Sequence, residues 1–311
     1  MKKYQTDFRM GDKMKAYIDL GFIKIHYYSI MYIIAFFLGI FIAGRDIVAK
    51  ERGVKDKKTI EDFAFWVMIS GLIGARVYYV LFKLSMYKDN PLSVFAVWEG
   101  GLAIHGGIIG AFIGACIFAK RKKMNLWVLT DMGVGPLLIG QAIGRIGNYA
   151  NGEIEGVPTF TPWKVILNGN FEQWWAQYQS MSMEMQSKFK ELVPWGIVFP
   201  SGTSAGDSFP NFPLHPAMFY ESILNVIGFL LLWFYFRKKR YNPGVLSMIY
   251  LIMYALIRSF VSFFRVEDLS FFGIIRASHL ISIVMLILAV IGIKYFNRDN
   301  TKKDSSKKQG R

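Results

Sequence analysis

The chain has 311 residues, of which 53% are hydrophobic and only 19% are charged, yet its formal net charge is +15. Soluble domains carry about 25% charged residues, so basic clusters must alternate here with long apolar segments. This excludes a disordered chain, a collagen and an ordinary cytosolic globule. The single cysteine, Cys116, excludes an intramolecular disulfide framework and a cysteine-based zinc site, and the four histidines form no recognisable metal-ligand cluster.

Seven segments are long and apolar enough to cross a membrane as helices, which requires about 20 mostly apolar residues each. They lack the alternation of apolar and polar residues that is typical of transmembrane β-strands. Because backbone groups in hydrocarbon must then form their hydrogen bonds within one segment, helices are expected. The segments are residues 27–44, 63–82, 102–119, 126–144, 216–236, 244–264 and 274–293. The predicted fold is an all-α integral membrane protein with about seven transmembrane helices and a small extracytoplasmic head segment.

Basic clusters between the spans predict their orientation. The clusters follow spans one, three, five and seven, at residues 50–58, 120–123, 237–240 and 294–311. Because excess Lys and Arg marks the cytoplasmic side, we expect the N-terminus outside and the C-terminus in the cytoplasm. The N-terminal segment is also basic, which opposes this orientation, but four consistent clusters outweigh one. The first apolar segment starts too far from the N-terminus for a cleavable signal peptide, and basic residues follow it where a cleavage site would have small residues.

The chain is predicted to have five parts. They are an extracytoplasmic N-terminal segment (1–26), helices one to four with a Gly- and Asn-rich segment (27–153), an extracytoplasmic head (154–214), helices five to seven (215–294) and a basic cytoplasmic tail (295–311). Within the head, helical spacing over 174–192 indicates an amphipathic helix, either at the membrane interface or packed on the head. Residues 200–213 are rich in Gly, Ser and Pro and are expected to form an irregular loop.

Polar side chains within and beside the spans converge on the outer leaflet in this topology. Such groups are costly in hydrocarbon and usually face a cavity or the bundle interior. The convergent residues are Tyr28, Arg76, His105, Arg145, Asn148, Asn151, Glu153, His215, Tyr220, Glu221, Tyr254, Arg258, Arg265, Arg276 and His279. Asp131 is the exception. It lies in the inner half of span four, and we expect it to bond to backbone freed near Pro136.

Several arginines in one leaflet suit an anionic headgroup, because a guanidinium presents a planar fork of donors to phosphate. The alternative is that an arginine merely extends to the membrane interface. Headgroup binding is favoured for Arg145, which has Asn148 three residues later on the same face, and for Arg258, which has Tyr254 four residues earlier. For Arg265 and Arg276 both interpretations stay open.

Small residues predict close packing of the second and third spans. Gly106, Gly110 and Gly114 recur at four-residue spacing after His105, and Gly74 lies in the second span. Small side chains at this spacing let two helices approach closely. For the glycines alone, helix packing without a functional site is the favoured interpretation.

The segment GRIGNYANGEIEG, at residues 144–156, resembles the signature of bacterial prolipoprotein diacylglyceryl transferases. HGGIIGA at 105–111 is similar to a second motif of that family. Further similar segments follow in the family's order: IHYYS at 25–29, GARVYYVLF at 74–82, WGIVFP at 195–200, HPAMFYE at 215–221, and Tyr254, Arg258 and Arg265 in span six. The resemblance extends from about residue 19 to residue 294.

Three features depart from the family's pattern. Ser262 stands where the family usually has a glutamate in span six, so charge balance there would fall to Glu221 or Glu267. His279 stands where a glutamine is usual. Residues 161–193 look like an insertion, and the resemblance assigns it no function.

The resemblance implies a multi-pass enzyme of the bacterial plasma membrane. It would transfer the diacylglyceryl group of phosphatidylglycerol to the lipobox cysteine thiol of a preprolipoprotein, forming a thioether and releasing glycerol 1-phosphate. The implied partners are phosphatidylglycerol, the signal-peptide lipobox and membrane lipid, with no nucleic acid. Neither a metal nor a soluble cofactor is implied.

Such a displacement needs the cysteine as a thiolate, although an ordinary cysteine thiol has a pKa of about 8.5. It also needs cationic hydrogen-bond donors that stabilise the leaving phosphate. Finally, both amphiphilic substrates must be held in the correct orientation. We therefore expect His105, Arg145 and Arg258 to be catalytic, with both arginines on the phosphate. His105 is either the general base or a structural histidine. The residues expected to bind phosphatidylglycerol are Arg145, Asn148, Asn151, Glu153, Tyr28, Arg76, Tyr254 and Arg265.

Two other functions would use the same arginines. A lipid flippase or transporter would line a path through both leaflets, often with inverted repeats, whereas the polar residues here stop in the outer half. A non-catalytic lipid-binding scaffold would not need His105 together with Asn148 and Glu153. A covalent thioether product distinguishes the enzyme from both.

Overall fold

The computed structural model describes residues 17–19, 24–88, 90–97, 100–153, 155–266, 270–271 and 275–309. The chain divides into two compact units. The first unit consists of Met1–Ala35, Leu138–Leu232 and Met248–Lys294, and the second of Phe36–Leu137, Trp233–Ser247 and Tyr295–Arg311. Several long helices therefore begin in one unit and end in the other.

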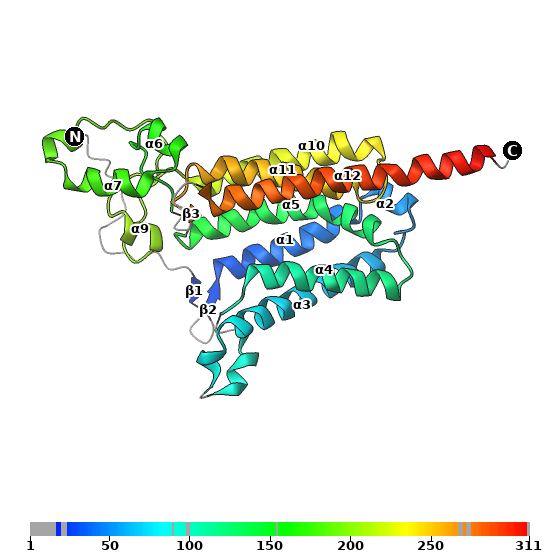
Figure 1. Cartoon of the computed structure of the whole chain (residues 1–311). Helices are drawn as coiled ribbons and strands as arrows, with labels where there is room; N and C mark the ends of the chain where they lie inside the picture. Colours follow the sequence, from blue (N-terminus) through cyan, green and yellow to red (C-terminus); the bar gives the residue numbers. More distant parts are fainter. Residues whose placement is uncertain are drawn as a thin grey trace. The chain divides into compact units, whose positions relative to one another are not determined.

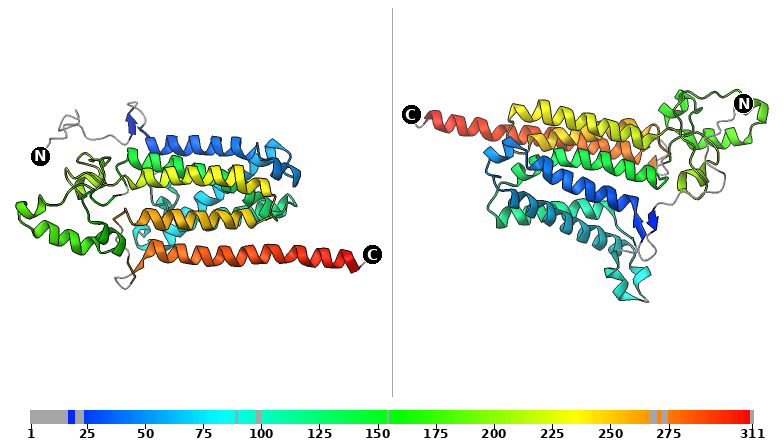
Figure 2. Two further views of the ribbon diagram at one scale, coloured as in Figure 1. Left: turned by 90° about the horizontal axis from the view of Figure 1, so that it is seen from above. Right: turned by 180° about the vertical axis from the view of Figure 1, so that it is seen from behind.

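Apolar helices dominate the described part of the chain (Figures 1 and 2). They are α1 (Tyr27–Ala43), α3 (Lys57–Phe82), α4 (Ile104–Arg121), α5 (Leu126–Ala150), α10 (Ala217–Leu231), α11 (Val245–Ser262) and α12 (Ala277–Gln309). Six helical segments are long and apolar enough to cross a membrane, and one of them is α10 with its helical continuation to Lys239. Helix α1, with 17 residues, is a shorter apolar helix. The prediction of about seven membrane-length helices is confirmed.

Short elements connect these helices. They are α2 (Ile47–Glu51), η1 (Leu84–Tyr87), η2 (Pro91–Phe95), η4 (Leu232–Phe236), η5 (Arg237–Lys239) and two antiparallel strand pairs, β1 (Tyr17–Asp19) with β2 (Lys24–His26) and β3 (Ser270–Phe271) with β4 (Ile275–Arg276). The carboxylates of Asp46 and Asp56 cap α2 and α3 by accepting the N–H of Ala49 and Thr59. An acceptor at this position satisfies an N–H that a helix start leaves unpaired.

The head, in the first unit, contains α6 (Trp163–Asn168), α7 (Phe171–Ser180), α8 (Met183–Gln186) and α9 (Ser204–Ser208) (Figure 1). Residues of α6, α7, α9 and their connections form an apolar core together with Met218 of α10. Trp174 and Tyr178 are buried in this core. Of the two placements predicted for the amphipathic segment, α7 therefore adopts the one packed on the head.

Two details of the predicted head were wrong. The single helix expected over 174–192 is broken, because Met181 has an extended backbone and Ser182 starts a new helix by capping it with its hydroxyl. The loop expected over 200–213 contains α9, which Thr203 caps in the same way. Ser and Thr favour such caps over helix interiors because their hydroxyls bond to nearby backbone.

Helices α3 and α4 pack face to face in the second unit (Figure 2). A Cβ added at Gly74 would lie 2.4 Å from the carbonyl oxygen of Gly106 and 2.8 Å from the Cα of Gly110. No side chain fits between backbones this close, so the glycines have the packing role predicted for them.

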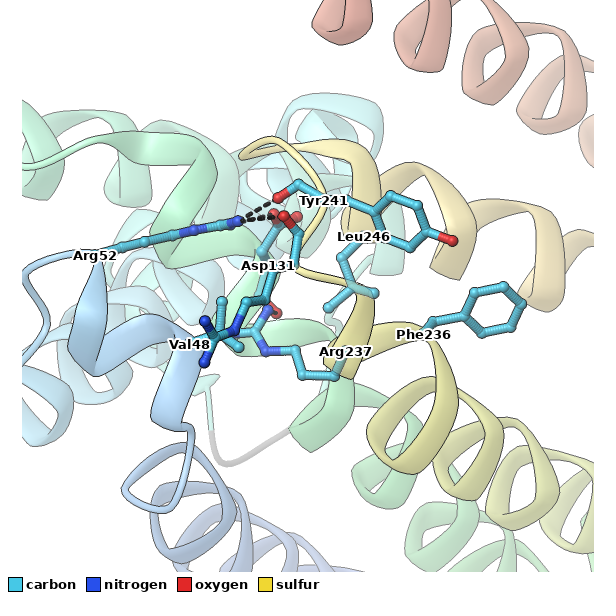
Figure 3. Close-up of a pocket in the computed structure, with 8 residues that line it drawn as sticks. Val48, Arg52, Asp131, Phe236, Arg237, Tyr241 and Leu246 are labelled. Carbon is cyan, nitrogen blue, oxygen red and sulfur yellow. Dashed lines mark hydrogen bonds and ion pairs between the residues drawn. The ribbon is translucent and has the colours of Figure 1, made fainter.

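Two carboxylates of the second unit, those of Asp46 and Asp131, are buried. Figure 3 shows Asp131 beside Arg52 and Arg237. Asp131 accepts the N–H groups of Gly244 and Ser247 at 2.8 Å, so it caps the start of α11. The expectation that Asp131 bonds to backbone near Pro136 was therefore wrong. Asp46 forms a buried, bidentate ion pair with Arg237.

Candidate active site

An ion pair between two helices forms the centre of the site in the first unit. Arg145, near the end of α5, donates from Nη2 to Oε1 of Glu221 in α10 at 2.6 Å. The glutamate side chain is 1% exposed and the arginine 22%. A buried carboxylate needs a cationic partner, and the partial exposure of Arg145 leaves part of its guanidinium accessible. Of the two acids proposed to balance charge in span six, Glu221 is paired with Arg145 of α5, and Glu267 lies outside the described residues.

The segment that follows α5 wraps around Arg145. Its Nη1 donates to Oδ1 of Asn148 at 3.2 Å, and Nδ2 of Asn148 donates to Glu153 at 2.9 Å. Asn151 donates to the other oxygen of Glu153 at 3.1 Å. Arg145, Asn148, Glu153 and Asn151 therefore form one hydrogen-bonded chain, and the carboxylate of Glu153 fixes both amides.

A glycine makes this turn possible. Gly152 has φ of +63°, a backbone conformation that side chains disfavour. A Cβ there would also lie 2.4 Å from the Cβ of Thr203. The turn brings Glu153 back toward α5, where its N–H bonds to the carbonyl of Asn148 at 3.0 Å.

The end of α11 brings further cationic groups to the same place. The charges of Glu221, Arg145, Arg258 and Arg265 all act on the hydroxyl of Tyr254, so these groups share one electrostatic environment. Backbone pairing holds this arrangement, because Gly156 and Arg265 form an antiparallel bridge. The structure therefore brings together the arginines predicted from α5 and from α11.

Helix α1 supplies the predicted tyrosine. A Cβ added at Gly147 would lie 2.9 Å from the ring of Tyr28, so this ring packs directly on α5. Tyr32 lies one turn later, with its ring centroid 4.6 Å from that of Tyr28, and the charges of Arg145 and Glu153 act on it. Tyr32 was missed by sequence reasoning, although its spacing of four residues from Tyr28 places both on one face.

The site contains buried acceptors that no described residue satisfies. They are Oε2 of Glu221, Oδ1 of Asn151 and Oε1 of Gln141. Buried polar atoms without a hydrogen-bond partner are uncommon in proteins. These acceptors therefore fit a ligand that carries hydroxyl groups.

Arg76 and His105 belong to the second unit. Arg76 is buried and donates four hydrogen bonds to backbone carbonyls, those of Ser93, Val94, Gly100 and Gly101, at 2.6 to 3.1 Å. Its guanidinium therefore holds the segment around η2.

His105 lies in the first turn of α4 with an exposed side chain, and its ring centroid is 6.1 Å from that of Tyr78. Participation of His105 and Arg76 in the Arg145 site stays a prediction.

The departures noted in the sequence have structural roles. Oγ of Ser262 bonds to Oγ of Ser278 at 2.6 Å, and Arg276 donates to the carbonyl of Ser262. Nε2 of His279 lies 3.2 Å from the carbonyl oxygen of Ser259. These contacts join the start of α12 to α11.

Comparison with known proteins identifies relatives of this chain. The family model described as prolipoprotein diacylglyceryl transferase matches residues 15–295. A phosphatidylglycerol–prolipoprotein diacylglyceryl transferase of Fusobacterium nucleatum is 50% identical over 290 residues, which cover 92% of this chain and 98% of the relative. Proteins of the same description from Thermosynechococcus vestitus and Shouchella clausii are each 32% identical, over 89% of this chain and 91% and 87% of their own lengths.

Proposed function

Because this chain belongs to the prolipoprotein diacylglyceryl transferase family, we propose that its Arg145 site binds phosphatidylglycerol and stabilises the departing phosphate. The protein is a multi-pass membrane transferase of lipoprotein biogenesis that acts on phosphatidylglycerol and a prolipoprotein. The observation that carries the proposal is the ion pair of Arg145 with the buried Glu221, held in place by the bonds of Arg145 to Asn148 and of Asn148 to Glu153.

The free donors of Arg145 suit a phosphate. Its guanidinium has five N–H donors, of which the bonds to Glu221 and Asn148 use two. Those two bonds fix the plane of the guanidinium, so its remaining N–H donors are oriented before the lipid binds. Preorganised donors stabilise charge that grows in the transition state, and each such donor contributes about hundredfold or more in rate.

The buried acceptors suit the glycerol headgroup. Phosphatidylglycerol carries two free hydroxyls beyond its phosphate, and each can donate a hydrogen bond. Oε2 of Glu221 and Oδ1 of Asn151 lack a partner among the described residues. We assign these two acceptors to the headgroup hydroxyls, which distinguishes this lipid from one whose headgroup has no hydroxyl.

The reaction follows from this placement. The thiolate of the lipobox cysteine attacks the glyceryl carbon that bears the phosphate ester, a carbon–sulfur bond forms, and the carbon–oxygen bond breaks. Glycerol 1-phosphate leaves with the electron pair, and Arg145 and Arg258 balance its growing charge. The thiol proton passes to a base, for which His105 is the candidate by residue type.

The orientation is also part of the proposal. With the N-terminus outside the bacterial plasma membrane and the C-terminus in the cytoplasm, the Arg145 end of α5 lies at the outer face, as does the head of residues 154–214. The lipobox cysteine of a translocated prolipoprotein would meet the site there. A protease-sensitive tag at each terminus, probed in intact spheroplasts, tests this orientation.

A transfer assay tests the function. Purified protein is mixed with labelled phosphatidylglycerol and a synthetic peptide that contains a lipobox cysteine. We expect a thioether-linked diacylglyceryl peptide and an equal amount of glycerol 1-phosphate, with no product from a peptide whose cysteine is replaced by serine. Movement of the lipid across vesicles without covalent product would instead show a flippase.

A further inference from the structure

An apolar cavity of about 280 Å³ lies in the first unit, where the head meets α10 and α11. Its walls are aromatic and aliphatic, and they include Trp163, Trp195, Ile223, Leu224, Phe260 and Phe264. None of these residues belongs to the phosphate site. Ile223 of α10 and Phe260 of α11 are 58% and 51% exposed, so the side chains that line the cavity continue to the apolar surface of these two helices.

Tyr220 is the hydrogen-bonding centre of the wall, whereas Nε2 of His215 is buried without a partner among the described residues. Nε1 of Trp195 donates to the hydroxyl of Tyr220 at 2.8 Å, and this hydroxyl lies 3.1 Å from Nδ1 of His215. His215 is 1% exposed, and burial lowers its pKa to about 4. The imidazole is therefore neutral at physiological pH, and the wall carries no charge.

This lining distinguishes between two kinds of occupant. A peptide segment carries an N–H and a carbonyl at nearly every residue, and each unbonded group costs about 1–3 kcal/mol when buried. The described wall offers a peptide almost no exposed polar atoms to bond. A saturated hydrocarbon chain has no such requirement and gains from contact with apolar walls, so the cavity fits an acyl chain better than a peptide.

The cavity and the phosphate site share two helices. In α10, Tyr220 of the cavity immediately precedes Glu221 of the ion pair. Near the end of α11, Phe260 follows Arg258 by two residues, and Phe264 immediately precedes Arg265. One amphiphile with its phosphate at the arginines can therefore direct a tail along the neighbouring faces of α10 and α11.

We propose that this cavity holds one acyl chain of the substrate phosphatidylglycerol, a proposal that rests on the proposed function of the Arg145 site. The cavity then determines how strongly the enzyme favours long acyl chains. It also fixes the glyceryl carbon relative to the arginines, because the lipid is held at both ends.

Filling the cavity tests the proposal. Ile223→Trp adds bulk at the cavity, and Ile227→Trp adds the same bulk one turn further along α10, at an exposed position outside the lining. Both variants are assayed with dihexanoyl and dipalmitoyl phosphatidylglycerol in mixed micelles. We expect the wild type to favour the dipalmitoyl lipid in kcat/KM, Ile223→Trp to lose roughly tenfold of that preference, and Ile227→Trp to keep it.

A second variant and a binding measurement guard against misfolding of Ile223→Trp. Leu224→Phe fills the cavity with a smaller group and should lower the chain-length preference in the same direction. A dipalmitoyl phosphatidylglycerol with a mid-chain diazirine should label cavity residues such as Trp195 in the wild type and in Ile227→Trp, and much less in Ile223→Trp.

Each result decides between the proposals. An unchanged chain-length preference in both cavity variants, or no labelling of the cavity in the wild type, overturns the acyl-chain assignment. A wild type that transfers neither lipid refutes the proposed function instead. Cross-linking of the lipobox peptide rather than the lipid to the cavity would show a peptide site and overturn the assignment.

Discussion

Gly156 and His215 touch through their backbones: a Cβ added at Gly156 would lie 1.9 Å from the carbonyl oxygen of His215. The neighbouring Val157 accepts the N–H of His215 at 2.9 Å. The chain that follows α5 and the chain that leads into α10 are therefore in direct contact. This contact sets the distance between the helices that carry Arg145 and Glu221.

Gly156→Ala should consequently separate the two segments. Because the obstructing atom is backbone and cannot rotate away, we expect a loss of stability of about 1–3 kcal/mol and a large loss of transfer activity. Thermal unfolding in detergent and the transfer assay measure the two effects. Gly133→Ala is the matched control, since a Cβ at Gly133 meets nothing within 4 Å; a Gly156→Ala enzyme as active as this control would contradict the interpretation.

Arg145→Ala should abolish phosphate stabilisation and also leave Glu221 buried without its cation. We expect transfer to fall at least about hundredfold and stability to fall by about 3–5 kcal/mol. The double variant Arg145→Ala with Glu221→Gln removes the unpaired charge. It should recover most of the stability and none of the activity, so recovery of transfer in the double variant would remove Arg145 from the phosphate site.

The burial of His215 predicts a pH dependence of stability. Its pKa falls from 6.5 to about 4 on folding, so the unfolded chain binds the proton more tightly. Stability is fully present above pH 6.5 and declines as pH falls toward 4, by about 3 kcal/mol in total. The loss of stability is measured as the fall in the unfolding midpoint from pH 7.5 to pH 4, for the wild type and for His215→Gln. If both midpoints fall by the same amount, His215 is not the group that titrates.

Arg76→Ala should free the segment around η2, because four backbone carbonyls lose their donor. We expect limited proteolysis within residues 84–97 to accelerate clearly. Arg76→Lys should not restore protection, since a single ammonium cannot reproduce a planar fork. Normal protection combined with a raised KM for phosphatidylglycerol would instead support the substrate-binding role predicted from the sequence.

His105→Gln tests the remaining catalytic assignment. A general base contributes about 10²- to 10⁴-fold in rate, so a loss of that size with unchanged unfolding temperature is expected if His105 takes the thiol proton. A variant that is only slightly slower makes His105 structural.

Features that depend on neighbours in the chain were predictable from the sequence. The apolar segments were found as helices because hydrocarbon allows few alternatives. Arg145 and Asn148 are bonded because three residues separate them on one helix. The ordered motifs identified the family from the same local information.

Features that depend on residues far apart in the chain were harder to predict from the sequence. The sequence offered Glu221 and Glu267 for charge balance in span six, and only folding shows that Glu221 pairs with Arg145, which lies 76 positions earlier in the chain. Arg76 has an ordinary position for a headgroup ligand, yet its donors bond to a loop whose path the sequence does not reveal. Asp131 was assigned to its own helix although its partners are 113 and 116 residues away.

The pairing of Asp46 with Arg237 also bears on biogenesis. The two residues are 191 positions apart, so the carboxylate is synthesised long before its cation. A nascent chain that stops before Arg237 keeps Asp46 uncompensated within an apolar bundle. Truncated chains should therefore be degraded, and only a polypeptide translated past its fifth apolar segment can persist.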